Sequence, residues 1–283
     1  MEESIAENPL KQKLFDYFSS FSSVLIAFSG GVDSALLAAV ACRIPGLRVM
    51  AVTFRTPLVP DQDIRTARAV AEELGIDHIV IGQDFADIPE ILRNTKERCY
   101  LCKKHNFEML GEFAKKNGFE VIFEGTNASD VTGSVSRPGY QALLEYSSFV
   151  RSPFAELGIF KSDIRKMAAE MGLSVAARPS ASCLATRIPY NTEITEKLLK
   201  TIILAEKKLT DDGFTDVRVR YHKEAGSRRT FARIEVAPDQ TTRLVSPAYA
   251  EEAAGYFRAL GFDYVTADLN GFRSGSMDIE NPD

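Results

Sequence analysis

The sequence predicts an α/β fold, in which a parallel-sheet domain is followed by a smaller α/β domain. Short apolar runs alternate with stretches of helical spacing up to about residue 176, a pattern typical of a parallel sheet covered by helices. A glycine-rich turn joins the first apolar run to a helix. After an irregular segment at residues 176–192, two alternating strands follow each other closely.

Length and composition fit a globular protein of two domains. The chain has 283 residues, 45% of them hydrophobic, and no apolar run approaches the ~20 residues that a membrane-spanning helix needs. The formal charge of −5 weighs against a nucleic-acid partner, because phosphate contacts need clustered Lys and Arg. The acidic N-terminus lacks the basic start of a secretory signal, so we expect a cytoplasmic protein without a membrane partner.

The elements of the first domain follow from apolar runs and from residues that favour helix ends. The expected strands are residues 24–28, 48–54, 78–81, 120–123 and 149–153. The expected helices cover residues 10–22, 61–74, 101–117, 141–146 and 161–172. Asp61 or Asp63 is expected to cap the second of these helices, while Gly75 and Gly118 are expected to end two of them.

The second domain reads as a small α/β unit. Its expected helices are residues 193–209, 239–245 and 247–260, and its expected strands are residues 215–221, 231–236 and 263–269. Residues 274–283 form an acidic tail. We place the boundary after residue 183, which gives domains of residues 1–183 and 184–283.

The segment Ser29-Gly30-Gly31-Val32-Asp33-Ser34 predicts a phosphate site between the first strand and a helix. Glycines let the backbone approach an anion closely, and the amides and dipole of the helix stabilise negative charge. Asp33 fits such a site if it orients the loop or helps to hold a metal ion. The segment is neither a Walker A loop nor a dinucleotide fingerprint. The alternative is a tight turn without a ligand.

A second polar turn follows the fourth expected strand and contains Gly125, Thr126 and Asn127. In an open α/β sheet the ligand lies at the carboxyl ends of the strands, so this turn is expected beside the first one. A turn with an Asn cap is the alternative.

The four cysteines fall into three settings. Cys99 and Cys102 form a C-x-x-C at the start of an expected helix, where the dipole favours thiolate. This spacing fits a redox pair, half a zinc site, part of an iron–sulfur site or coincidence. Cys42 lies among apolar residues and is interpreted as core. Cys183 lies on the irregular segment, and long irregular loops are often functional.

These motifs together resemble a known family. The hexapeptide at residues 29–34 matches the PP-loop of the ATP-pyrophosphatase superfamily. The chain also contains three further motifs: Cys-Tyr-x-Cys-Lys, Gly-Thr-Asn and Pro-Ser-x-x-Cys-Leu-Ala-Thr-Arg-Ile-Pro-Tyr. Together with the PP-loop, they make the chain look like the LarE family of ATP-dependent sulfur transferases over nearly its whole length. The resemblance implies an adenine nucleotide alpha hydrolase-like sheet domain. One departure is Asn191, where a glycine is usual, and it affects a turn rather than the chemistry.

The resemblance implies a reaction on a small nucleotide substrate, pyridinium-3,5-biscarboxylic acid mononucleotide. ATP, with Mg²⁺, adenylates a carboxylate, and a sulfur held by the enzyme then displaces AMP. Arg218 and Arg220 are expected to contact the substrate phosphate, and Arg187 to hold AMP or to favour the Cys183 thiolate. A solvated basic face is the alternative for Arg218 and Arg220. The expected binding residues are Ser29, Gly30, Gly31, Val32, Asp33, Ser34, Thr53, Gly125, Thr126, Asn127, Arg187, Arg218 and Arg220.

The sulfur source divides the family. Members with one loop cysteine sacrifice it, whereas members with three cysteines hold a [4Fe–4S] cluster that carries an extra sulfide. This chain resembles the second kind, with Cys99, Cys102 and Cys183 as cluster ligands and with Cys183 and Asp33 as catalytic residues. Glu206 and Glu235 are expected near a metal site. Related proteins assemble as homo-oligomers, hexamers among them.

Three other functions stay open at this point. A tRNA thiolase would share the PP-loop and the cysteines, but the acidic charge and the lack of a zinc ribbon count against it. An amidating ligase, such as an NAD or GMP synthetase, leaves three cysteines unexplained. A nucleotide-binding module without turnover would release no pyrophosphate.

Overall fold

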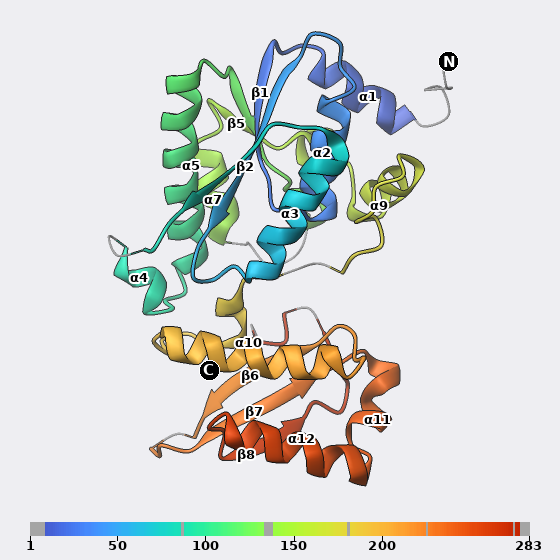
Figure 1. Cartoon of the computed structure of the whole chain (residues 1–283). Coiled ribbons are helices and arrows are strands. Elements are labelled where there is room, and N and C mark those ends of the chain that lie inside the picture. The colour runs from blue at the N-terminus through green and yellow to red at the C-terminus, as the bar shows by residue number, and fades with distance from the viewer. Residues whose placement is uncertain are drawn as a thin grey trace. The chain divides into compact units, whose positions relative to one another are not determined.

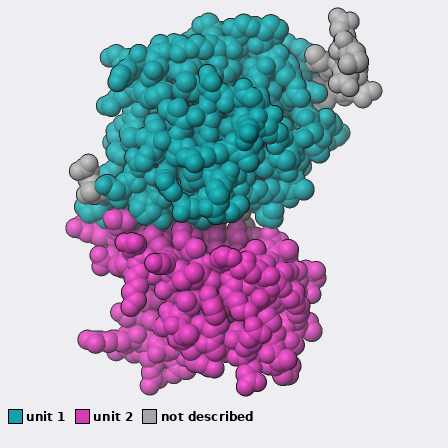
Figure 2. Space-filling model, viewed as in Figure 1, with its two compact units in different colours: residues 1–91, 97–181 teal, residues 92–96, 182–283 magenta. Residues whose placement is uncertain are grey.

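The chain forms two compact units in a computed structural model (Figure 2). The first unit contains residues 1–91 and 97–181, and the second contains residues 92–96 and 182–283. The structure describes residues 9–85, 88–132, 138–179, 182–224, 226–273 and 275–277. Most of the acidic tail predicted at residues 274–283 lies outside this set. Within it, no helix has both the length and the apolar character to span a membrane.

A five-stranded parallel sheet forms the centre of the first unit (Figure 1). The strand order is β3-β2-β1-β4-β5. The strands are β1 (Ser23–Ala27), β2 (Arg48–Arg55), β3 (His78–Gly82), β4 (Val121–Phe123) and β5 (Val150–Arg151). The predicted α/β fold is therefore confirmed, and β1 and β4, separated by some ninety residues in sequence, pair directly.

Helices cover both faces of this sheet (Figure 1). Val24 and Ile26 of β1 pack with one apolar cluster and Leu25 with another, because successive side chains of a strand point to opposite faces. The first cluster includes side chains of α1, α2, α3 and α9, and the second those of α5 and α7. The helices that the structure describes between Pro9 and Glu170 are α1 (Pro9–Phe18), α2 (Val32–Ala41), α3 (Asp61–Leu74), α4 (Pro89–Leu92), α5 (Arg98–Asn117), α6 (Ala128–Val131), α7 (Pro138–Glu145), α8 (Pro153–Glu156) and α9 (Lys161–Glu170); α4 ends in the segment that belongs to the second unit.

The ends of two helices are formed as predicted, but one predicted cap is wrong. Gly75 and Gly118 end α3 and α5 in the left-handed conformation that glycine favours. The residue before α3 is Pro60, which provides no side-chain cap. Asp61 and Asp63 lie inside the first turn and instead form ion pairs, to Arg55 at 2.8 Å and to Arg178 at 2.7 Å respectively. Both carboxylates pair with arginines outside the helix, and the sequence pattern around the helix start does not predict these ion pairs.

The interpretation of Cys42 as a core residue is also wrong. Helix α2 ends at Ala41, and Cys42 is its C-cap residue. Its side chain is exposed, although the residues that precede it in α2 are buried. The apolar neighbourhood in the sequence therefore belongs to the helix, and Cys42 lies just beyond the buried stretch.

The second unit is built on the three-stranded sheet β6-β7-β8. Strand β6 (Arg218–Lys223) pairs antiparallel with β7 (Thr230–Glu235), and β7 pairs parallel with β8 (Tyr264–Ala267). The core contains Phe214, Val219 and Phe257. Its helices are α10 (Glu196–Asp211), α11 (Thr241–Leu244) and α12 (Pro247–Ala259), with single turns η2 (Leu184–Arg187) and η3 (Pro238–Gln240).

Candidate active site

The glycine-rich loop joins β1 to α2 and is held in shape by its own serine hydroxyls. The Ser34 hydroxyl donates a hydrogen bond to the Gly31 carbonyl over 3.1 Å and accepts one from the Ser29 amide over 3.2 Å. The Gly31 amide donates to the Ser29 hydroxyl over 3.3 Å. Val32 begins the helix with a buried side chain. The loop is thus held in shape by its own hydrogen bonds, and the N-terminus of α2 follows directly.

Gly30 allows this loop to pack against the backbone of a neighbouring helix. Its φ is +69°, and a Cβ built on it would lie 2.5 Å from the Cα of Ala67 in α3. Any other residue would meet backbone atoms that cannot turn aside.

We therefore expect Gly30→Ala to destabilise the fold more than Gly75→Ala does. Both positions have left-handed φ, which costs roughly 1–2 kcal/mol for a residue with a Cβ. Gly75 has nothing within 4 Å of its Cβ position, whereas Gly30 adds an overlap that costs about 1–3 kcal/mol more. Urea unfolding of the two variants measures the difference. Equal losses in free energy of unfolding would show that the packing of Gly30 against Ala67 does not restrict the side chain at position 30.

A cavity of about 380 Å³ opens beside the loop in the first unit. It is lined by residues that follow β1 and β4 and by side chains of α5. The loop residues among them are Ser29, Asp33, Ser34, Gly125, Thr126 and Asp130. Because β1 and β4 are adjacent parallel strands, the turns at their carboxyl ends meet at one edge of the sheet.

The second polar turn packs directly against the first, as predicted. The Asn127 side-chain Nδ2 donates a hydrogen bond to the Asp33 carboxylate over 3.3 Å, and a Cβ on Gly125 would lie 3.0 Å from the Asp33 Cβ. Asn127 also forms a capping box with Asp130 at the start of α6. Asp33 forms an ion pair with Lys161, the first residue of α9. One carboxylate therefore joins the loop, the second turn and α9.

A buried acid–base cluster at the cavity was missed by the sequence interpretation. Glu124 is buried and pairs with Lys103 over 3.0 Å. It also accepts hydrogen bonds from the amide and hydroxyl of Thr126, over 3.0 and 2.9 Å, and from the hydroxyl of Ser152. Two signals could have revealed it, since Lys103 follows the C-x-x-C and Glu124 precedes the glycine of the second turn.

Thr53 is buried in β2 and is absent from the cavity lining. Its hydroxyl donates a hydrogen bond to the carbonyl of Phe28 over 2.6 Å and lies 2.8 Å from Nε2 of His78. Burial, followed by the charge of Arg68, lowers the pKa of His78, so this ring is neutral at pH 7. The Thr53 hydroxyl has one proton, which it donates to the Phe28 carbonyl. The hydroxyl oxygen therefore accepts a hydrogen bond from Nε2 of His78. Thr53 thereby fixes the residue just before the loop.

Cys99 and Cys102 are the second and fifth residues of α5, three residues apart on one side of the helix. Cys99 is exposed and Cys102 partly exposed, so both thiols are near solvent. Within the described ranges, no group of three His, Cys, Asp or Glu side chains is arranged to hold a metal ion. Cys183 belongs to the second unit, and the predicted convergence of the three thiols stays a prediction.

In the second unit, Arg187 shapes the segment that carries Cys183. Its guanidinium forms two hydrogen bonds to Glu206, over 2.9 and 3.2 Å, and donates to the carbonyls of Ser182 and Cys183 over 2.9 and 3.2 Å. Glu206 in turn accepts a hydrogen bond from the Val219 amide over 2.9 Å. Arg187 therefore connects the backbone at the exposed Cys183, through hydrogen bonds and Glu206, to α10 and β6.

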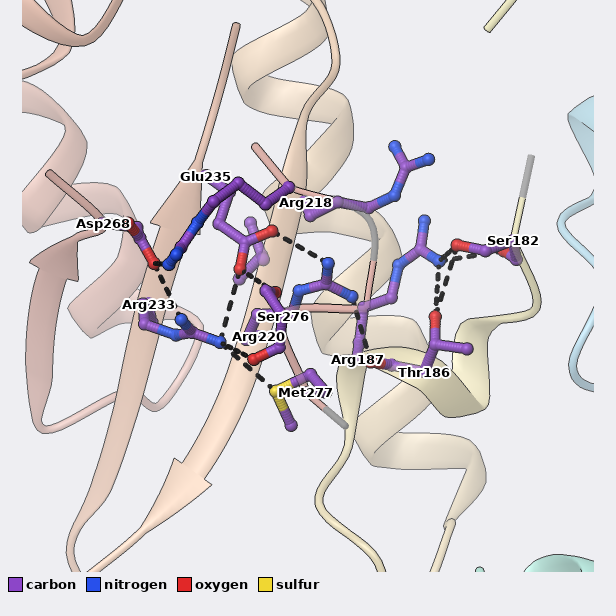
Figure 3. A network of polar contacts seen from close by, with 12 residues as sticks. Ser182, Thr186, Arg187, Arg218, Arg220, Arg233, Glu235, Asp268, Ser276 and Met277 are labelled. Atoms are coloured by element: carbon purple, nitrogen blue, oxygen red, sulfur yellow. Dashed lines mark hydrogen bonds and ion pairs between the residues drawn. The ribbon is translucent and has the colours of Figure 1, made fainter. Parts of the chain in front are cut away.

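Arg218 and Arg220 are buried, so the interpretation of a solvated basic face is wrong. Arg220 donates to the Thr186 carbonyl over 3.0 Å and pairs with Glu235 over 2.8 Å (Figure 3). Arg218 lies 4.9 Å over the Phe272 ring. Burial, followed by the charge of Arg187, lowers the pKa of Arg218. The packing of Phe272 on Arg218 and of β7 on Arg220 removes these side chains from water.

Glu206 and Glu235, which were expected near a metal site, form ion pairs with arginine guanidinium groups. Glu235 is fully buried and contacts Arg220, Arg233 at 3.3 Å and the Ser276 hydroxyl at 2.5 Å (Figure 3). Among the residues described, the buried Nε of Arg220 has no hydrogen-bond partner. A group of buried cations with an unused donor is suited to an anion.

Comparison with known proteins identifies the relatives of this arrangement. A family model described as asparagine synthase matches residues 18–253. An uncharacterized protein of Synechocystis sp. is 35% identical over 277 residues, which is 98% of both chains. The pyridinium-3,5-bisthiocarboxylic acid mononucleotide synthase of Lactiplantibacillus plantarum is 32% identical over 268 residues, which is 94% of this chain and 93% of that protein.

A more distant relative is the tRNA-specific 2-thiouridylase of Sphingopyxis alaskensis, 28% identical over 194 residues. That match covers 56% of this chain and 50% of the thiouridylase. The resemblance to the LarE family, first indicated by the motifs, is confirmed by the near-complete match to the Lactiplantibacillus synthase. The chain belongs to the asparagine synthase family of PP-loop proteins and, within it, to the family of that synthase.

Proposed function

We propose that this protein is an ATP-dependent sulfur transferase that converts pyridinium-3,5-biscarboxylic acid mononucleotide to its bisthiocarboxylic form, a step in making a nickel-pincer nucleotide cofactor. One observation carries the proposal. The polar loop at the N-terminus of α2 faces a cavity in a chain that matches the Lactiplantibacillus synthase over 94% of its length. The C-terminal residues 184–283 would serve sulfur transfer and assembly into homo-oligomers, and the protein would act in the cytoplasm.

The first half-reaction makes the carboxylate reactive. A substrate carboxylate oxygen attacks the α-phosphorus of ATP, an acyl–AMP anhydride forms, and pyrophosphate leaves. The amides of the Gly30–Gly31 loop and the serine hydroxyls suit the negative charge that develops on pyrophosphate. Mg²⁺ would stabilise the same charge, and Asp33, a carboxylate of the glycine-rich segment that lines the cavity, would help to hold it.

The second half-reaction places sulfur on the activated carbonyl. Sulfur attacks the acyl carbon, AMP departs and a thiocarboxylate remains, so that two rounds are needed for two carboxylates. Cys99, the partly exposed Cys102 and Cys183 together provide three thiolate donors, which would suit a [4Fe–4S] cluster that carries an extra sulfide. Such a cluster would supply the extra sulfide.

Adenylation of a defined carboxylate tests the function directly. The protein is incubated with ATP and, in separate reactions, with the pyridinium biscarboxylate, unmodified tRNA, and the substrates of NAD and GMP synthetases with ammonia. Of these reactions, only the one that contains ATP and the pyridinium biscarboxylate is expected to release pyrophosphate. Release that depends on tRNA would support a thiolase of the kind found in Sphingopyxis, ammonia-dependent release would support an amidating ligase, and ATP binding without release would support a binding module.

Arg218 is expected to serve substrate binding more than turnover. Arg218→Ala removes a buried cation from the second unit, and loss of a hydrogen bond to a charged phosphate should raise KM by about 10- to 100-fold with little change in kcat at saturation. The exposed Arg229 offers a matched control with the same change in charge. An unchanged KM in Arg218→Ala, or an equal rise in Arg229→Ala, would count against phosphate binding at Arg218.

A further inference from the structure

A short segment of the chain belongs to the second unit although the residues on both sides belong to the first. Residues 92–96 follow Ile91 of the first unit, and the chain returns to that unit at Glu97. Helix α5, which carries Cys99 and Cys102, begins one residue later at Arg98. The insertion is therefore placed directly before the C-x-x-C.

Asn94 holds this segment by its side chain and its backbone. Its amide Nδ2 donates hydrogen bonds to the carbonyls of Ile188 and Pro189, over 3.1 and 2.8 Å. Its own carbonyl accepts a hydrogen bond from the Asn191 amide over 2.9 Å, and the Leu92 carbonyl accepts one from the Ile194 amide over 2.7 Å. We call these bonds between residues 92–94 and residues 188–194 the Asn94 clamp.

The backbone conformation and the two carbonyl acceptors at position 94 favour asparagine. Asn94 is fully buried and has a φ of 60°, a left-handed conformation that Asn tolerates better than most residues. Two carbonyl acceptors need two N–H donors, which a carboxamide supplies and an ionised carboxylate cannot. Without the side-chain amide, the buried Ile188 carbonyl would lose this donor, at a cost of about 1–3 kcal/mol for an unsatisfied group, and the part-buried Pro189 carbonyl would keep only the Thr192 amide, at 3.2 Å.

The two sides of the Asn94 clamp flank the cysteines in the sequence, one just before the C-x-x-C and one just after Cys183. Cys99 follows Asn94 by five residues, and Cys183 precedes Ile188 by five residues. Five residues span at most about 18 Å when fully extended, so the clamp limits how far each cysteine-bearing segment can move from it. Between Cys183 and Ile188 the turn η2 and the bonds of Arg187 shorten that reach further.

We propose that Asn94 is a positioning residue for sulfur transfer. It ties the segment that carries Cys183 to the segment that leads into the C-x-x-C helix, and so keeps the three thiols available to one another. This role rests on the proposed function, since it assigns the cysteines to one reaction. It does not extend to the adenylation step, which uses the glycine loop of the first unit.

The test compares Asn94→Gly with Asn191→Gly. Glycine accepts the left-handed φ at both positions, so each variant removes a side chain without adding backbone strain. Asn191 is exposed, whereas Asn94 is buried with its amide bonded to two carbonyls. Each variant is assayed for pyrophosphate exchange, for thiocarboxylate formation and for thermal unfolding.

A fourth assay, independent of turnover, measures cross-linking of Cys183 to Cys99 or Cys102. A short bifunctional thiol reagent is applied to the reduced, cluster-free protein, with the exposed Cys42 replaced by Ser so that it cannot react. Asn94→Gly is expected to keep pyrophosphate exchange near the parent level, to lose thiocarboxylate formation by about tenfold or more, and to cross-link less. Asn191→Gly is expected to match the parent in all four assays.

Two results would overturn the proposal. One is an Asn94→Gly variant with parental cross-linking and thiocarboxylate formation. The other is an equal loss of exchange and transfer together with a lower unfolding temperature, which indicates a general structural role. If the parent protein makes no thiocarboxylate at all, the proposed function fails, and the cross-linking yields still decide whether the clamp positions the thiols.

Discussion

Replacement of Asp33 by Ala is expected to abolish adenylation while the fold is retained. The Asp33 carboxylate contacts Lys161 of α9 and Asn127 of the second turn, so it joins three segments around the cavity. Its side chain is partly exposed and adds little apolar packing. Without it, the loop and the second turn lose their common partner, and misplacement of reacting groups by about 1 Å costs on the order of 100-fold in rate.

Asp61→Ala is the matched control for this variant. Asp61 also lies in the first turn of a helix that follows a parallel strand, but its carboxylate is exposed and pairs with Arg55. ATP–pyrophosphate exchange should be lost in Asp33→Ala and unchanged in Asp61→Ala, with similar urea unfolding midpoints in both. Normal exchange in Asp33→Ala would show that this carboxylate has no part in the chemistry.

Replacement of Cys183 by Ser is expected to eliminate sulfur transfer and to leave adenylation intact. Cys183 is exposed on a segment fastened by Arg187, and it belongs to the unit that does not contain the glycine loop. If the three cysteines share a cluster, Cys99→Ser and Cys102→Ser should lose iron, sulfide and repeated transfer to the same extent. Anaerobic iron and sulfide assays with single- and multiple-turnover product counts measure this.

The sacrificial alternative gives a different pattern. In that case Cys183 alone would matter, and after one turnover the protein would lose the mass of one H₂S as Cys183 becomes dehydroalanine. Cys42→Ser is the control, because this thiol is exposed at the end of α2 and has no assigned role. Full multiple-turnover activity in Cys99→Ser and Cys102→Ser would exclude the cluster.

Much of the first unit was predictable because its signals are local. Buried strands read as apolar runs, Gly75 and Gly118 mark helix ends, and the glycine loop lies between a strand and a helix. Asn191 stands where the family resemblance leads us to expect a glycine, and its φ of 60° lies in the left-handed region that glycine favours and asparagine tolerates. The adjacency of the two polar turns followed from the rule that ligands bind at the carboxyl ends of parallel strands.

The parts that escaped prediction depend on contacts between residues far apart in sequence. The ion pair of Asp33 with Lys161 joins residues 128 positions apart, and no local pattern selects one lysine among many. The burial of Arg218 follows from Phe272, which packs over its guanidinium from beyond β8. Asn94 looks like an ordinary loop residue in the sequence, and only the folded second unit reveals its two carbonyl partners.

The most direct test of sulfur transfer is the mass of the product. Anaerobically prepared protein with a sulfide source is incubated with ATP, Mg²⁺ and pyridinium-3,5-biscarboxylic acid mononucleotide, and the nucleotide is analysed by mass spectrometry alongside AMP and pyrophosphate. We expect sulfur to replace one carboxylate oxygen for each AMP and pyrophosphate released, so that the singly substituted product appears first and the doubly substituted product second. AMP and pyrophosphate released with the substrate recovered unchanged, or recovered as an amide, would contradict it.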